Sequence, residues 1–293
     1  MRLFLCLLSI LFGWLTPVHA GLQDELRAAH AAALKYQNIR TAKRAGWRPF
    51  GGEAPLMGRH YSHPQGPDYV SGDQIDFSRP SNLVYATIGG KTALVALAYI
   101  VRIAPGEALP TGFSGARDVW HIHDGVRFLA AVRETRPMMA GLAERWFNRN
   151  MVEKDGKTQL AMVHVWLIPN PKGRFASHNP RLAYLDLGLP AERADDMKIA
   201  RGLALTRKNG CEEALDAELW LSGAPRRVVR GIKSACRSAA ERVRGARSDG
   251  ILAMEAEAAR QYRRVEDAVQ ISLTPAQLKR MTAFVEDGPG ICR

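Results

Sequence analysis

Two histidines separated by one residue form the first pattern in the sequence whose type and spacing could do chemistry. His121 and His123 stand in the segment Trp120–Asp124. On a β-strand, residues i and i+2 point to the same face, so the two imidazoles would lie close enough to share one cation. A neutral imidazole nitrogen is a common ligand of zinc, copper and iron. Two partly exposed polar residues on a loop are the alternative interpretation.

Two further histidines could complete such a site. His164 stands inside the apolar, strand-like segment 159–168, where a polar side chain must be buried or face a cavity. It is then either a core histidine with one hydrogen bond or a metal ligand from a distant strand. His60 stands in the Gly- and Pro-rich stretch 46–81, which predicts a loop or short turns. We interpret His60 as a fourth ligand or an acid–base group beside a metal, or else as part of a surface turn.

Together these positions predict a metal site. The predicted ligands are His60, His121, His123 and His164, and the predicted ion is a divalent transition metal, namely Zn, Cu, Fe or Mn. Such an ion would act on a small molecule as a Lewis acid or as a redox centre. The sequence specifies no reaction, so whether the protein is an enzyme stays open.

Four other residues near the predicted site have less specific patterns. His63 and His178 both lie in turn-rich segments. His178 follows the His164 segment closely, so it could fold back over the site or stabilise its own turn. Asp118 and Asp124 flank the two-histidine pattern, and either could orient a ligand imidazole through a hydrogen bond.

The segments that must position these residues predict an α+β fold. The Ala-rich stretch 22–45 has the apolar spacing of an amphipathic helix. Two β-prone runs on either side of Gly89–Gly90 predict a hairpin over 82–101. Segments 119–123 and 159–168 predict further strands. We therefore expect a small, mostly antiparallel sheet with packed helices, followed by a C-terminal helical region.

The last third of the chain predicts helices held by a disulfide. We predict a mixed, histidine-bearing domain over 21–190 and a helical region over 191–293. Cys236 lies on the apolar stripe of one predicted helix, and Cys211 begins the helix before it. Pairing of Cys211 with Cys236 across this hairpin is our first choice, and Cys292 is the free thiol or the alternative partner.

The N-terminus is typical of a secretory signal peptide over residues 1–20. One arginine precedes an apolar run from Leu3 to Leu15, Pro17 ends the run, and Ala20 offers a small residue for cleavage. The run is shorter than the about 20 residues that a membrane-spanning helix needs. We expect an exported protein, periplasmic or secreted, cleaved after Ala20, with an uncleaved anchor as the alternative.

The 293-residue chain carries a formal net charge of +12, and one predicted helix concentrates much of it. Arg226, Arg230 and Arg237 form a basic stripe on that helix. The segment lacks aromatic residues for base stacking, and an exported protein meets little nucleic acid, so we expect no nucleic-acid partner. Contact with an anionic cell-envelope surface is one interpretation, and a solvated basic face is the other. The alternative function is thus a non-catalytic envelope protein that works through this helix. The oligomeric state is unknown.

Three motifs occur within about residues 21–182. They are Gly58-x-His60-Tyr61-x-x-Pro64, then Arg79-Pro80-x-x-Leu83-x-Tyr85, then His164-Val165-Trp166-Leu167 followed by Asn170-Pro171-x-Gly173-x-Phe175. Together these motifs resemble those of a family of uncharacterised secreted bacterial proteins. The resemblance implies export and one shared fold, and it implies no activity.

A looser likeness concerns the site alone. His121 and His123 with a later His164 are similar to the metal ligands of cupins. The glutamate that cupins place soon after the two histidines is missing, because Asp124-Gly125-Val126-Arg127 follow here. We therefore treat the likeness as an analogy of site and not of fold.

Overall fold

The structure is a computed structural model that describes residues 21–63, 75–115, 118–150 and 156–283 of the chain. The predicted signal peptide, 1–20, and Cys292 lie outside these residues. Within them, no helix is long and apolar enough to cross a membrane.

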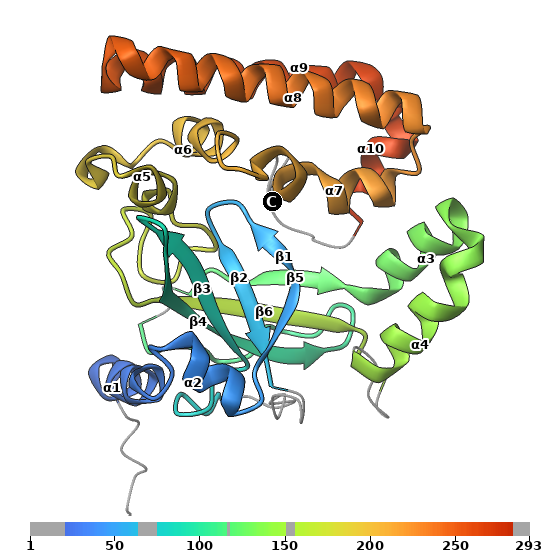
Figure 1. Cartoon of the computed structure of the whole chain (residues 1–293). Helices are drawn as coiled ribbons and strands as arrows, with labels where there is room; N and C mark the ends of the chain where they lie inside the picture. Colours follow the sequence, from blue (N-terminus) through green and yellow to red (C-terminus); the bar gives the residue numbers. More distant parts are fainter. Residues whose placement is uncertain (1–20, 64–74, 116–117, 151–155, 284–293) are drawn as a thin grey trace, which may run out of the picture.

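Strands and helices combine in an α+β fold, as predicted (Figure 1). The strands are β1 (Arg48–Ala54), β2 (Gly58–Ser62), β3 (Asn82–Ile88), β4 (Lys91–Ile103), β5 (His121–Asp124) and β6 (Gln159–Trp166). They form one six-stranded sheet in the order β1-β2-β3-β4-β6-β5, and the described strand pairs are all antiparallel. The predicted hairpin is confirmed, because β3 and β4 pair across Gly89–Gly90. Strands β1 and β2 were not predicted, since their segment contains too many glycines and prolines to show a strand pattern.

Ten α-helices accompany the sheet in the described residues. They are α1 (Leu22–Leu34), α2 (Ile39–Arg44), α3 (Gly125–Thr135), α4 (Ala140–Asn150), α5 (Arg181–Leu187), α6 (Met197–Ala204), α7 (Gly210–Ser222), α8 (Arg226–Gly245), α9 (Ile251–Ser272) and α10 (Pro275–Met281). The predicted helix over 22–45 is divided in two, because the side chain of Asn38 accepts the backbone N–H of Arg40 and starts α2 as a new helix.

Both faces of the sheet are covered. Ala29 of α1 and Ala42 of α2 share an apolar core with Val163 of β6 on one face. On the other face, Leu129 of α3 and Leu182 of α5 share a second core with Ala96, Met162 and other residues of β4 and β6. Covering on both faces explains why β6 is buried along its whole length.

The C-terminal helices form a further layer, with α8 and α9 side by side at the outer edge and α6 and α7 between them and the sheet (Figure 1). Helices α6 and α9 cross closely at Gly202, where an added Cβ would lie 2.1 Å from the carbonyl oxygen of Ala258. Arg207 joins this layer to the rest of the fold, because its guanidinium pairs with Glu53 at 2.6 Å and Asp186 at 3.0 Å. The division into domains 21–190 and 191–293 stays a prediction.

The disulfide between Cys211 and Cys236 is present, as our first choice predicted, and it joins α7 to α8. Both cysteines are buried. The two residues are separated by 25 positions, so the bond removes considerable freedom from the unfolded chain.

We expect the double variant Cys211→Ala/Cys236→Ala to lose about 3 kcal/mol of unfolding free energy, because a loop of this length is no longer closed in the unfolded state. Chemical denaturation of the variant and of the reduced wild type measures the loss. Equal stability of oxidised wild type and double variant would contradict the prediction.

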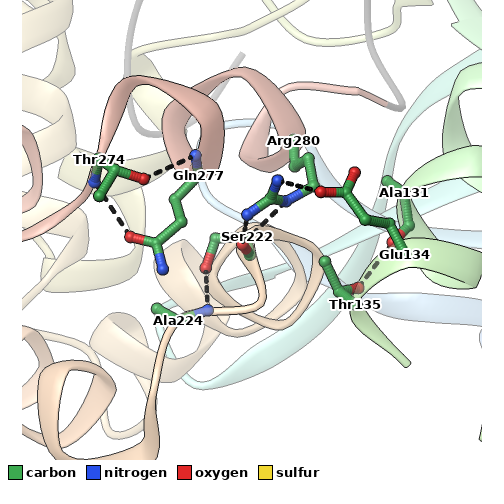
Figure 2. Close-up of polar contacts among 8 residues, drawn as sticks. All are labelled: Ala131, Glu134, Thr135, Ser222, Ala224, Thr274, Gln277 and Arg280. Atoms are coloured by element: carbon green, nitrogen blue, oxygen red, sulfur yellow. Dashed lines mark hydrogen bonds and ion pairs between the residues drawn. The ribbon is translucent and has the colours of Figure 1, made fainter. Parts of the chain in front are cut away.

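Helix α10 fastens α7 to α3 (Figure 2). It begins with a capping box between Thr274 and Gln277. At its other end, the guanidinium of Arg280 donates two hydrogen bonds of 3.2 Å to the buried backbone carbonyl of Ser222 and pairs with Glu134 of α3.

Replacing Arg280 with Ala is expected to lower the unfolding free energy by about 2 kcal/mol, because charge-assisted bonds to a buried carbonyl are lost. Glu134→Ala should cost under about 1 kcal/mol, since its side chain is 62% exposed and the pair is solvated. Thermal denaturation of both variants, with the exposed Arg263→Ala as control, checks the order of these effects. An Arg280→Ala protein as stable as the control would refute it.

Candidate functional site

A contact between His60 and His164 defines the centre of the candidate site. Their Nε2 atoms lie 3.0 Å apart, although β3 and β4 separate β2 from β6 in the sheet. Three strand spacings in a flat sheet amount to about 14 Å. The sheet therefore curls until the two imidazoles meet across its concave face. Strand β4, which lies between β2 and β6, carries the fully buried Ala96 and Ala98 at this place. Their small side chains leave room for the two imidazoles to meet.

Gly58 fixes the start of β2, the strand that carries His60. Its φ of +86° lies in the left-handed region, and an added Cβ would lie 2.7 Å from the carbonyl oxygen of Tyr85 on β3. Only glycine avoids both problems. The alternative interpretation of His60 as part of a surface turn is wrong, because His60 stands in a strand that pairs on both sides.

The two-histidine pattern lies on a strand, as predicted. His121 pairs with Met162, and His123 pairs with Leu160, so β5 runs beside the strand of His164. The rings of His121 and His164 are nearly parallel at 8°, with centroids 5.1 Å apart. The ring of His123 lies 5.1 Å from that of His121. The structure thus brings all four predicted ligands together.

His178 is a fifth member of this group, which we name the histidine cluster: His60, His121, His123, His164 and His178. The indole of Trp166, which stacks with the ring of His164, donates a hydrogen bond of 2.6 Å to the carbonyl oxygen of Ala176, so the loop that carries His178 lies beside the cluster. Nδ1 of His178 also lies 3.0 Å from Oγ of Ser177. The contact with Ser177 fits the interpretation that His178 stabilises its own turn, and a role of His178 in the site stays a prediction.

Burial keeps the histidine cluster neutral. His121, His164 and His178 are at most 8% exposed. Loss of hydration lowers the pKa to about 4 for His60, for His123 and for His178. For His121 and His164, burial comes first and repulsion from the neighbouring histidines second, and both lower the pKa well below its usual value. Neutral imidazoles retain a lone pair for a metal ion at pH 7.

Several ring nitrogens of the cluster lack protein partners. Neither nitrogen of His121 has a hydrogen-bond partner in the described part of the chain, and neither does Nδ1 of His164. A buried polar atom without a partner costs about 1–3 kcal/mol. Such atoms require an explanation, and a bound ligand is one.

The cluster is not a finished metal site. Within the described ranges, no three His, Cys, Asp or Glu side chains converge as the ligands of one ion. The four predicted ligands are neighbours, and the two Nε2 atoms of His60 and His164 lie 3.0 Å apart. A third histidine would reach this point only after its side chain rotated. A sequence pattern carries no information about side-chain rotamers.

Three residues near the cluster have other contacts. Asp124 accepts the backbone N–H of Arg127 and the side-chain amide of Gln159, so it caps α3. Asp118 accepts the backbone N–H of Phe113 and closes a loop. Nε2 of His63 lies 2.9 Å from the carbonyl oxygen of Ala45, so His63 fastens the end of β2 to α2.

The arginines of the basic stripe on α8 differ in their contacts. Arg237 pairs with Glu212 of α7 at 3.4 Å. Arg226 and Arg230 are exposed, and among the described residues neither forms a salt bridge. Part of the stripe therefore stabilises the helical layer, and part faces outward.

Comparisons of the chain with protein-family models, with curated proteins and with solved structures find no match. The resemblance to a family of secreted proteins stays a prediction. The interpretation of the site therefore depends on the geometry of this chain alone.

We expect the metal-free protein to lose stability as the pH falls from 6.5 towards 4. Unfolded histidines have a pKa of 6.5, whereas those of His60, His123 and His178 are about 4 in the folded state. Between these values unfolding takes up protons, so the free energy of unfolding rises with pH and is greatest above pH 6.5. Each such histidine adds a slope of about 1.4 kcal/mol per pH unit.

Urea denaturation between pH 4 and 7.5, with a chelator present, measures this slope. His178→Gln should reduce the slope by the share of one histidine, whereas His30→Gln on the exposed face of α1 should leave it unchanged. A stability independent of pH over this range would show that the cluster is charged or hydrated when folded.

Proposed function

We propose that the protein is exported and binds one divalent transition metal ion, Zn, Cu, Fe or Mn, through the histidine cluster. The observation that carries the proposal is the 3.0 Å distance between Nε2 of His60 and Nε2 of His164. Two nitrogens that each lie about 2.0–2.1 Å from one ion are about 3.0–3.4 Å apart. The pair therefore already has the spacing of two ligands of one ion.

His121 is the nearest source of a third ligand. Its ring stacks on that of His164, and both of its nitrogens lack protein partners in the described residues. Rotation about its side-chain bonds would exchange a buried, unpaired nitrogen for a coordinated one. His123 and His178 lie next to it and could occupy further positions. Because all five imidazoles are neutral at pH 7, metal binding would not have to displace protons from them.

Export is supported by two features. The segment 1–20 has the pattern of a signal peptide. The disulfide between Cys211 and Cys236 is of the kind that persists in an oxidising compartment. The proposal includes no reaction, and a metal-binding protein without catalysis would meet it.

Elemental analysis tests the proposal. The chain is expressed at full length without a histidine tag, purified from the compartment in which it accumulates, and analysed for transition metals. We expect about one equivalent of one metal. After chelation, titration with Co²⁺ should give the visible absorption bands of a nitrogen-coordinated ion.

His60→Gln and His164→Gln should weaken binding of the metal by about 100-fold, because each removes one of the two preformed ligands. His63→Gln is the matched control, since this histidine contacts the Ala45 carbonyl and the ring of Trp47. Circular dichroism verifies that each variant is folded. Protein that is metal-free and takes up neither Co²⁺ nor Zn²⁺, or a His164→Gln variant that binds like the control, would overturn the proposal.

A further inference from the structure

An apolar groove with a basic rim lies beside edge strand β1, and no member of the histidine cluster lines it. It has a volume of about 780 Å³ and is lined by β1, α3, α4, α7 and α8. This volume is within the range of about 300–1,000 Å³ that small-molecule sites occupy. The groove lies where edge strand β1 faces the helices that follow the other edge strand, β5.

Aromatic side chains form the apolar part of the groove. Phe50 of β1 stacks on Trp146 of α4 with centroids 6.1 Å apart, and Phe128 of α3 meets the same indole edge-on at 5.7 Å. Trp220 of α7 is 38% exposed and Phe50 is 44% exposed. Rings of this size are seldom left exposed together unless they contact a ligand or partner.

The rim of the groove is positively charged. Arg136, Arg226, Arg230 and Lys233 line it, against the single carboxylate of Asp216, which pairs with Lys233. The guanidinium of Arg136 lies 5.8 Å above the ring of Trp220. Arg226 and Arg230 project outward from the first turns of α8 and form no salt bridge to the described residues. The charge therefore favours an anionic ligand.

The hydrogen-bonding groups of the lining narrow the chemical class of the ligand further. The arginine, lysine and tryptophan side chains of the lining only donate hydrogen bonds, so they pair best with a ligand group that only accepts them. A saturated acyl chain carries no donor, and a carboxylate only accepts. We propose that the groove binds a long-chain fatty acid, with the acyl chain against the aromatic rings and the carboxylate against Arg226 and Arg230.

Displacement of a fluorescent fatty acid by dodecanoate, from the full chain without metal, tests this proposal. We expect dodecan-1-ol to bind about tenfold more weakly than dodecanoate, because it lacks the charge that the guanidinium groups attract. Decanoate should bind about 15-fold more weakly than dodecanoate, since it lacks two methylenes and each contributes about fourfold.

Matched variants locate the site. Arg230→Glu should raise the Kd for dodecanoate by about tenfold or more, whereas Arg237→Glu, the same change on the same helix but outside the groove, should leave it nearly unchanged. Trp220→Ala should weaken binding by about tenfold, and Ile271→Ala, at an 85% exposed position on α9, should not.

Each of the following four outcomes would overturn the proposal. No displacement by dodecanoate would exclude the site, and equal effects of Arg230→Glu and Arg237→Glu would indicate non-specific attraction. Binding to anionic phospholipid vesicles without binding of free dodecanoate would assign the face to a membrane surface. A dimer in light scattering that Trp220→Ala dissociates would assign the groove to a second copy of the chain. His164 does not line the groove, so the His164→Gln variant should lose metal and retain dodecanoate binding. This difference distinguishes failure of the metal site from failure of the groove.

Discussion

The curl of the sheet is the constraint on which the rest of the structure depends. It brings His60 of β2 within 3.0 Å of His164 of β6 across two intervening strands. A large side chain at Ala96 or Ala98 would occupy the space over which the imidazoles meet. Because the concave face is closed by helices, the imidazoles there lose hydration and stay neutral. A flat sheet of the same strands would leave His60 and His164 as two unrelated polar residues.

The sequence predicted the elements whose patterns are local. The hairpin at Gly89–Gly90, the apolar strand of His164 and the Cys211–Cys236 pairing all follow from periodicity or turn chemistry within short segments. The strand of His60 was missed because Gly58 is required by its positive φ and by its contact with β3. A glycine that serves tertiary packing has the same appearance in a sequence as one that ends a strand.

The candidate site shows the same limit. Histidine type and spacing predicted as ligands four of the five residues of the histidine cluster, and the alternation of a strand explains why His121 and His123 belong to one group. Sequence patterns say nothing about which imidazole nitrogens converge, because that depends on side-chain rotation and on the curl. They also did not separate the two interpretations of His178, whose loop returns over β6 through tertiary contacts. Proximity was predictable here, and coordination geometry was not.

The histidine cluster and the apolar groove meet at the same edge of the sheet. Phe50 lines the groove and is the cross-strand partner of His60 in the β1–β2 pair. Side chains of directly paired residues have Cβ atoms about 4.5–5.5 Å apart on one face. Phe50 therefore contributes to the groove and is at the same time a cross-strand neighbour of His60. Burial within the fold already lowers the pKa of His60 to about 4, so this imidazole is neutral at pH 7 whether or not the groove is occupied.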